Sequence, residues 1–412
     1  MKISPFRKLV KPDEAMSIVL GQTTAVEETE EVPLSECTGR VLAADIVSRI
    51  DVPPFDRCAM DGYAVRSCDV ESAREHSPVT LKVVGELFAG DAKKIKVMKG
   101  TACRVATGAV LPQGADAVIM AEYTGEEKLK SGRKEATIVK ILRAEPKMGN
   151  VSKQGSDMKK GAVVLTKGTV LDPAKVGVLA SVGRERAEVL SRPRLAILST
   201  GNEIAEPGGK LGPAQVYNSN SFTLASLVRA NGGLAEVLPG AKDTKEGLMD
   251  AIKQAIHIGV DAIVLSGGSS VGERDLLFGV VSEMGEVLFH GVQIKPGKPF
   301  LFGKIGRLLI FGIPGYPASC LTVGYVFLAP AVRKMAGLPA DRRTVKAKAS
   351  RRIASRLGRV QFLAVKVESG EAIPVFKESG AITSLAAADG YIIIHDNVEF
   401  IEKGEDVEVV LF

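Results

Sequence analysis

Residues 194–199, RLAILS, open a series of four short apolar runs that continues with LAEVLP (234–239), DAIVLSGG (261–268) and LLIFGI (308–313). Each run has the length of a buried strand, and helical segments lie between the runs. One helix is expected within 243–259, with Asp243 as its cap and Glu246 three residues on. This order predicts a doubly wound α/β domain with a mostly parallel sheet, whose ligands bind outside the carboxyl ends of the strands.

Three turn-rich loops follow apolar runs in the same region: SGGSSVGERD (266–275), KPGKP (295–299) and PGYPAS (314–319). Their glycines let backbone N–H groups face an anion, their lysines add positive charge, and Asp275 offers a hard oxygen ligand for a cation. The loops predict a crevice that phosphate and a metal could share. Two alternatives remain open: the lysine pair as a solvated surface turn, and PGYP as only a strand-to-helix corner.

The rest of the chain is rich in predicted strands. Short strands (LKVVGEL, ACRVATG, DAVIMAEY, ATIVKIL) predict an inserted β-rich domain, and alternating strands after Leu338 predict a small barrel. Asp172 and Pro173 begin a predicted helix that we expect to pack with the N-terminal helix MSIVLGQT. The predicted domains are a discontinuous helical and mixed linker domain (1–48 and 144–190), the β-rich insertion (49–143), the α/β domain (191–337) and a C-terminal β-barrel (338–412).

Composition is typical of a soluble globular protein of several domains, with 412 residues, 45% of them hydrophobic. The net charge of +6 is concentrated in residues 341–359, which carry eight Lys/Arg against one Asp. Three interpretations of this basic stretch are open: solvated barrel strands, capture of a phosphate around Arg359, or nucleic-acid binding. The third is disfavoured because only 5% of the residues are aromatic and none is Trp, so no stacking platform is evident.

Cysteine usage and hydropathy predict a cytoplasmic protein. The five cysteines are scattered without a C-x-x-C pair, which argues against a disulfide framework and a thiolate zinc site. The N-terminus lacks the apolar core of a secretory signal. Residues 308–332 carry no charge and are long enough to span a bilayer, but Gly312, Pro314 and Pro317 cut the stretch into a strand, a turn and a helix. We therefore expect a buried core and no membrane span.

Several common chemistries lack support in the sequence. Gly268, Ser270 and Gly272 form the G-x-S-x-G spacing of a serine-hydrolase elbow between a strand and a helix. None of the four histidines lies in a glycine-flanked loop that would present a catalytic imidazole, and no HGGG segment is present, so an anion-binding role for these glycines is favoured. Dinucleotide binding and P-loop hydrolysis have no motif here.

Two segments far from the α/β region also carry candidate residues. PPFDRCAMDGYAV (53–65) holds Asp56 and Asp61 among residues that restrict the backbone, and RVATGAVLPQGADAVIM (104–120) places Thr107 at the end of a predicted strand. Each could be only a turn that leads into a strand. Neither segment alone indicates a chemistry.

Taken together, these segments closely resemble one family, the MoeA-type molybdopterin molybdenumtransferases, which are related to the E domain of gephyrin. The resemblance covers essentially the whole chain in family order and includes GSDMKKG, LSTGNEI, VYNSNS, KPGKPFLFG, IPGYPAS and SLAAADGYIII besides the segments above. It implies four regions, with an α/β domain like that of MogA, the molybdopterin adenylyltransferase. It also implies a homodimer whose active site lies between the α/β domain of one subunit and the β-rich domain of the other.

The implied reaction uses adenylylated molybdopterin and molybdate or tungstate, requires Mg²⁺ and releases AMP. The catalytic residues that the resemblance implies are Asp61, Thr107, Glu203, Asp243, Asp275, Lys295 and Lys298. The residues expected to bind the pterin substrate are Gly267, Gly268, Ser270, Gly272, Pro314, Pro317 and Arg359. Asp61, Glu203, Asp243 and Asp275 would hold Mg²⁺ or position the attacking oxygen, with Asp157 as a secondary member.

Three departures from the family pattern limit this transfer: Tyr316 replaces an Asn, Asn202 an Asp and Cys58 a Ser. Tyr316 could reshape the oxyanion pocket, which leaves the choice between molybdenum and tungsten open. Two other functions remain alternatives, a carrier or scaffold without turnover and a molybdopterin adenylyltransferase. The expected partners are the pterin substrate, a second copy of the chain and an adenylyltransferase, with no nucleic acid and no membrane.

Overall fold

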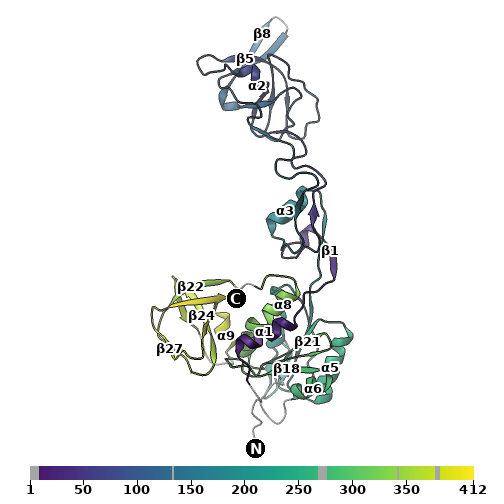
Figure 1. Cartoon of the computed structure of the whole chain (residues 1–412), viewed down its shortest axis with the longest axis vertical. Coiled ribbons are helices and arrows are strands. Elements are labelled where there is room, and N and C mark those ends of the chain that lie inside the picture. The colour runs from purple at the N-terminus through teal and green to yellow at the C-terminus, as the bar shows by residue number, and fades with distance from the viewer. Residues whose placement is uncertain (1–8, 132–133, 268–275, 341–342, 376–380) are drawn as a thin grey trace, which may run out of the picture. The chain divides into compact units, whose positions relative to one another are not determined.

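The computed structural model describes residues 9–131, 134–267, 276–340, 343–375 and 381–412 (Figure 1). The chain divides into two compact units. The first comprises residues 1–30, 39–41 and 188–412, and the second comprises residues 31–38 and 42–187. The finer domain boundaries proposed from the sequence stay a prediction.

A six-stranded sheet forms the centre of the first unit. Its order is β16-β13-β17-β21-β20-β18, with β13 (Arg194–Ser199), β16 (Leu234–Val237), β17 (Ala262–Ser266), β18 (Glu286–His290), β20 (Leu301–Ile305) and β21 (Leu308–Ile313). The four strands predicted from the apolar runs are mutually parallel, and β20 is antiparallel to both of its neighbours. The predicted α/β fold with a mostly parallel sheet is confirmed.

Alternate side chains of the central strands enter two separate cores, so both faces of the sheet are covered. Ile197, Val264 and Phe311 pack with α4, α7 and α8 on one face. Leu198 and Leu265 pack with α5 and α6 on the other. The helices are α4 (Asn220–Ala230), α5 (Lys245–His257), α6 (Leu276–Met284), α7 (Pro317–Val323) and α8 (Ala329–Met335). With the faces covered, a ligand has access only at the strand ends.

The N-terminal helix α1 (Pro12–Gln22) packs on the α/β core. Its buried residues, Ala15 and Val19, join the same core as residues of α8. Figure 1 shows α1 beside α8. The expectation that this helix packs with the one beginning at Asp172 is therefore wrong. The segment MSIVLGQT predicted a helix, but its sequence does not identify the element on which the helix packs.

The uncharged stretch 308–332 forms the predicted strand, turn and helix. Strand β21 is followed by α7, a π-helical segment (Gly324–Leu328) and α8, and most of their side chains lie in the core. Among the residues described, no helix combines the length and the apolar character that a membrane crossing requires.

The C-terminal strands close into a five-stranded barrel, as predicted. The ring is β24-β25-β22-β28-β26, closed by pairing of β24 with β26, and its strands are β22 (Thr344–Ala349), β24 (Val360–Glu368), β25 (Glu371–Pro374), β26 (Gly390–Ile394) and β28 (Asp406–Leu411). Strand β24 also pairs in parallel with the short β19 (Ile294–Lys295). This pairing ties the barrel directly to the lysine loop of the α/β region.

The second unit is built mainly of strands. Its six-stranded sheet has the order β7-β4-β6-β5-β9-β8, with β4 (Gly62–Val65), β5 (Val79–Leu87), β6 (Thr101–Val105), β7 (Ala117–Met120), β8 (Thr124–Ser131) and β9 (Lys134–Ile141). Strand β8 was not predicted from the sequence, because charged residues are typical of a turn. In the structure these residues lie on an edge strand that pairs with β9. Helix α3 (Pro173–Ser181) begins as predicted, since the Asp172 carboxylate accepts a hydrogen bond from Lys175 N.

Helix α5 begins one residue later than expected. Its cap is Thr244, whose hydroxyl accepts a hydrogen bond from the N–H of Gly247 at 3.1 Å. The prediction that Asp243 caps this helix is wrong, because the adjacent Thr244 has the extended backbone that directs its oxygen to the first turn. Asp243 is left in the loop that precedes the helix.

The cap makes a testable prediction about local stability. Thr244→Ala should accelerate native-state hydrogen exchange at Gly247 N–H roughly fivefold, because losing a cap costs about 1 kcal/mol. Asp243→Ala is the matched control and should leave that rate within about a factor of two. Faster exchange in the Asp243 variant alone would contradict the assignment.

Candidate active site

Three strands of the central sheet end side by side and place their loops at one edge. Ser199 of β13 lies opposite Ser266 of β17, which lies opposite Ile313 of β21. The ladder continues one step further, as Thr200 N donates to Ser266 O at 3.0 Å and Gly267 N donates to Ile313 O at 3.2 Å. The loops beginning at Thr200, Gly267 and Pro314 therefore start next to one another.

Gly267 is the point of closest approach between these loops. Its φ of +97° favours glycine, and a Cβ there would lie 2.5 Å from the carbonyl oxygen of Thr200. A Cβ on Gly315 would lie 3.5 Å from Gly267 Cα. Gly267 is the first glycine of the predicted anion-binding loop, and it lies where this loop meets the loops after β13 and β21. The other predicted members of this loop, namely Gly268, Ser270, Gly272 and Asp275, fall outside the described residues, and so does the candidate serine elbow.

Asn220, which the sequence interpretation did not single out, holds two of the loops together. Its Nδ2 donates to Ser266 Oγ and to Gly315 O, both at 2.7 Å, from the first residue of α4. The signal was present in VYNSNS, because Asn and Ser before an apolar helical run are typical of a helix start.

Thr200 is a second residue that the sequence did not reveal. Its side chain is 4% exposed, and within the described part of the chain its hydroxyl has no hydrogen-bond partner. The neighbouring Ser199 hydroxyl, by contrast, contacts Asn218 Oδ1 at 2.9 Å and Ser221 Oγ at 2.7 Å. A buried hydroxyl without a partner is uncommon, so Thr200 is a candidate hydrogen-bond donor to a ligand at this edge.

Two of the predicted carboxylates lie at the same edge of the sheet. Glu203 follows β13, and its carboxylate folds over Gly201, where a Cβ would lie 2.6 Å from Glu203 Oε1. The loop that carries Asp243 reaches this edge because Ala241 N donates to Ser199 O at 3.1 Å. Both acids are exposed. No group of three or more His, Cys, Asp or Glu residues within the described ranges has the arrangement of a metal site, so their role as ligands stays a prediction.

The lysine loop and the barrel bring positive charges together. Ile294 and Lys295 of β19 pair with Val360 and Gln361 of β24, so Arg359 arrives beside the loop. Burial, followed by the nearby charge of Arg359, lowers the pKa of Lys298 below its ordinary value. The charges of Lys298 and Arg359 therefore influence each other, and their role in binding an anion stays a prediction.

The loop after β21 forms a firm corner. Pro314 is buried, and Pro317 is the first residue of α7. Tyr316 precedes the helix without capping it, and its side chain is 68% exposed. The Tyr316 side chain therefore faces solvent, while Pro314 and Pro317 restrict the backbone of the loop.

Asp61 and Thr107 belong to the second unit and contact each other there. Asp61 Oδ1 accepts hydrogen bonds from Thr107 N at 2.7 Å and from Thr107 Oγ1 at 3.0 Å. These bonds, the backbone one first, hold the pKa of Asp61 below its ordinary value, so the exposed carboxylate is ionised. Asp157 is also exposed. Burial, with a contribution from Cys103, raises the pKa of Cys58 to about 12, so Cys58 is a neutral thiol.

Three family models match the chain in succession. The MoeA N-terminal region (domain I and II) matches residues 10–183, the "Probable molybdopterin binding domain" matches residues 196–334, and the MoeA C-terminal region (domain IV) matches residues 346–412. Together they extend over both units.

Relatives are similar over most of their length. A molybdopterin molybdenumtransferase of Haemophilus influenzae is 36% identical, with 79% of this chain and 77% of that protein covered. One from Nostoc sp. is 33% identical, with 93% and 89% covered. The crystal structure of a molybdopterin biosynthesis MoeA protein from Pyrococcus horikoshii superposes with a TM-score of 0.83 at 35% identity, covering 98% of this chain and 100% of that one.

The charge pair makes a testable prediction. Arg359→Ala should raise the pKa of Lys298, because removing a neighbouring positive charge favours the protonated amine, while burial keeps the value below that of a free lysine. NMR titration of the lysine side-chain signals would measure this shift. Arg352→Ala is the matched control, since Arg352 pairs with Glu402 at 3.4 Å. An unchanged Lys298 pKa in the Arg359 variant would refute the contact.

Proposed function

The chain belongs to the MoeA family of molybdopterin molybdenumtransferases, and we propose that it inserts molybdate or tungstate into adenylylated molybdopterin with Mg²⁺-dependent release of AMP. The observation that carries this proposal is the pairing of β19 with β24, which places Arg359 beside the loop that carries Lys295 and Lys298. A phosphoanhydride and an oxometallate together bring several negative charges to one place. Two cations in a partly desolvated site suit such a substrate better than an ordinary metabolite with one charge.

The residues at the strand edge supply binding and orientation in this proposal. Lys295, Lys298 and Arg359 hold the phosphate or the oxometallate. Because Gly267 has no side chain, its backbone can approach the substrate closely. The Thr200 hydroxyl donates a hydrogen bond to the substrate. An oxygen of water or of the oxometallate attacks one phosphorus of the anhydride. AMP leaves with the bridging oxygen if the pterin phosphorus is attacked, or with the attacking oxygen if its own phosphorus is attacked. The cations stabilise the negative charge that develops on the leaving phosphate.

Mg²⁺ fits the donors at this edge. The ion prefers oxygen ligands and usually binds through one or two carboxylates, substrate phosphates and water, without a complete protein cage. Glu203 and Asp243 are exposed carboxylates at the same edge, and the sequence adds Asp275. When bound, the ion would neutralise charge on the anhydride. These residues would hold it there and orient the phosphates.

We further propose that two copies of the chain complete the site. Asp61 and Thr107 form an ordered pair on the second unit, in which an exposed, ionised carboxylate accepts two hydrogen bonds from Thr107. A symmetric dimer would allow this pair to serve the α/β unit of the partner. An adenylyltransferase would supply the substrate, since the reaction consumes an adenylylated pterin.

Lys298→Ala should reduce AMP release at least about tenfold when the protein is incubated with adenylylated molybdopterin, Mg²⁺ and molybdate or tungstate, because it removes a charge that stabilises the transition state. Lys253→Ala, an exposed lysine of α5, is the matched control and should retain the wild-type rate. No AMP from the wild type with either oxyanion would refute the insertion reaction. Rates of AMP release that differ between the two oxyanions would identify the preferred metal.

The shared site can be tested by complementation. Asp61→Asn and Lys298→Ala should each inactivate the protein. After subunits of the two variants are mixed and exchanged, about a quarter of the wild-type activity should return, because half of the dimers would carry one intact site. No recovery despite demonstrated subunit exchange would place both residues in a site of one subunit.

A further inference from the structure

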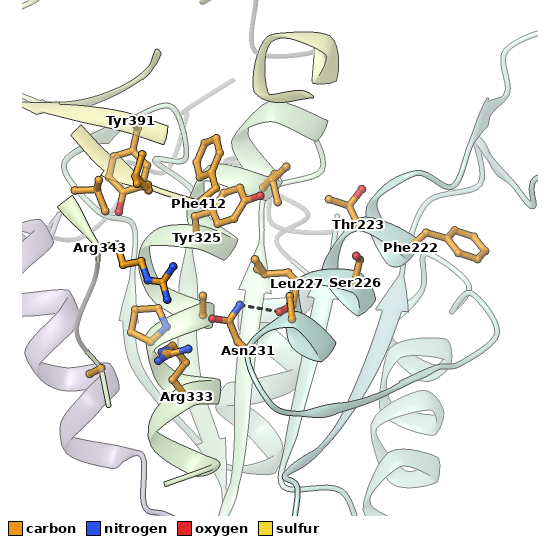
Figure 2. Close-up of a pocket in the computed structure, with 17 residues that line it drawn as sticks. Phe222, Thr223, Ser226, Leu227, Asn231, Tyr325, Arg333, Arg343, Tyr391 and Phe412 are labelled. Carbon is orange, nitrogen blue, oxygen red and sulfur yellow. Dashed lines mark hydrogen bonds between the residues drawn. The ribbon is translucent and has the colours of Figure 1, made fainter. Parts of the chain in front are cut away.

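A cavity of about 770 Å³ lies in the first unit between the α/β core and the barrel. Figure 2 shows Phe222 and Thr223 on one side, Asn231 and Arg333 in the lower part, and Tyr325 and Phe412 in the upper part. None of the candidate active-site residues lines it. Its volume is within the range of pockets that bind small molecules.

Two positively charged side chains are among the described residues that line the cavity. Arg333 and Arg343 both line it, and its described lining includes no acidic side chain. Arg333 Nε donates to Pro339 O at 2.8 Å, which orients the guanidinium, and neither arginine forms an ion pair within the described residues. Two guanidinium groups in one cavity repel each other, and a bound carboxylate or phosphate would relieve that repulsion through paired hydrogen bonds.

The same cavity presents aromatic surface. The rings of Tyr325 and Phe412 stack with their centroids 4.0 Å apart and an interplanar angle of 17°. Phe412 is 40% exposed, and Phe222, another residue that lines the cavity, is 51% exposed. Exposed aromatic side chains beside a cavity favour a planar apolar group, which can stack on them.

Arg343 also belongs to the basic stretch 341–359 whose role the sequence left open. Other members of this stretch have partners on the barrel, since Lys348 pairs with Asp406 at 3.1 Å and Arg352 with Glu402 at 3.4 Å. Arg359 lies beside the lysine loop, where its charge contributes to lowering the pKa of Lys298. The stretch is therefore divided among separate roles, and among its described residues Arg343 lines the cavity.

We propose that this cavity binds a small molecule that joins a planar aromatic group to a phosphate or carboxylate. The anionic end contacts Arg333 and Arg343, and the planar part lies against Tyr325 and Phe412. This site goes beyond the proposed transferase reaction and does not depend on it.

The test uses 1-naphthyl phosphate as the probe with the full-length protein. The chain contains no Trp, so naphthyl fluorescence can be followed without that background. Arg343→Ala should weaken binding about tenfold, because charge-assisted hydrogen bonds are lost, and Arg343→Lys should weaken it less. Phe222→Ala should also weaken binding. Arg351→Ala, an exposed arginine outside the cavity, is the matched control and should bind as the wild type does.

Three further measurements test whether the probe binds in this cavity and through both of its ends. Lys298→Ala should leave binding unchanged, whereas loss in that variant would assign the probe to the candidate active site and overturn the proposal. 1-Naphthol should bind at least about tenfold more weakly than the phosphate, as should inorganic phosphate alone. The proposal would also be overturned if 1-naphthol or inorganic phosphate bound as tightly as 1-naphthyl phosphate, or if Arg343→Ala did not weaken binding of the probe. Circular dichroism of Arg343→Lys would show that its fold is retained.

Discussion

The candidate site depends on one close approach of two backbones. Gly267 and Thr200 lie so near each other that a single added carbon at 267 would collide with a carbonyl oxygen. Because the backbones meet, the loops after β13, β17 and β21 occupy one small region. Asn220 can then reach both Ser266 and Gly315 from the start of α4. Parallel strands that end in register supply the alignment, and the glycine permits the contact.

Most of the fold could be predicted from the sequence because its signals are local. Apolar runs of strand length identified the central sheet, and Asp172 followed by Pro173 identified the start of α3. The errors occurred where two local signals compete, or where a local signal predicts a helix but not the element on which it packs. Asp243 and Thr244 are both good caps, and only the backbone decides between them. Helix α1 was expected from MSIVLGQT to pack with the helix that begins at Asp172, but Ala15 and Val19 pack in the α/β core.

Candidate site residues could be named from the sequence where they form a recognisable loop pattern. They could not be named where the residue type is common in any protein. Glycines and lysines in short loops pointed to Gly267 and Lys298 before any geometry was known. Thr200 and Asn220 were missed because Thr and Asn occur everywhere on protein surfaces, and only burial and hydrogen bonding distinguish them. Arg359 was named as a candidate for phosphate capture, but its position beside the lysine loop was not predicted, since no local pattern reveals a pairing between β19 and β24.

The pairing of β19 with β24 has a consequence for how this protein can be divided. A fragment that stops before the barrel would keep the sheet, the strand-end loops and Lys298, but it would lack Arg359 and the strand that orders the lysine loop. Its electrostatic field would differ from that of the intact chain even if it folded. The barrel is therefore not a separable module, and studies of isolated segments would misrepresent the affinity of this region for anions.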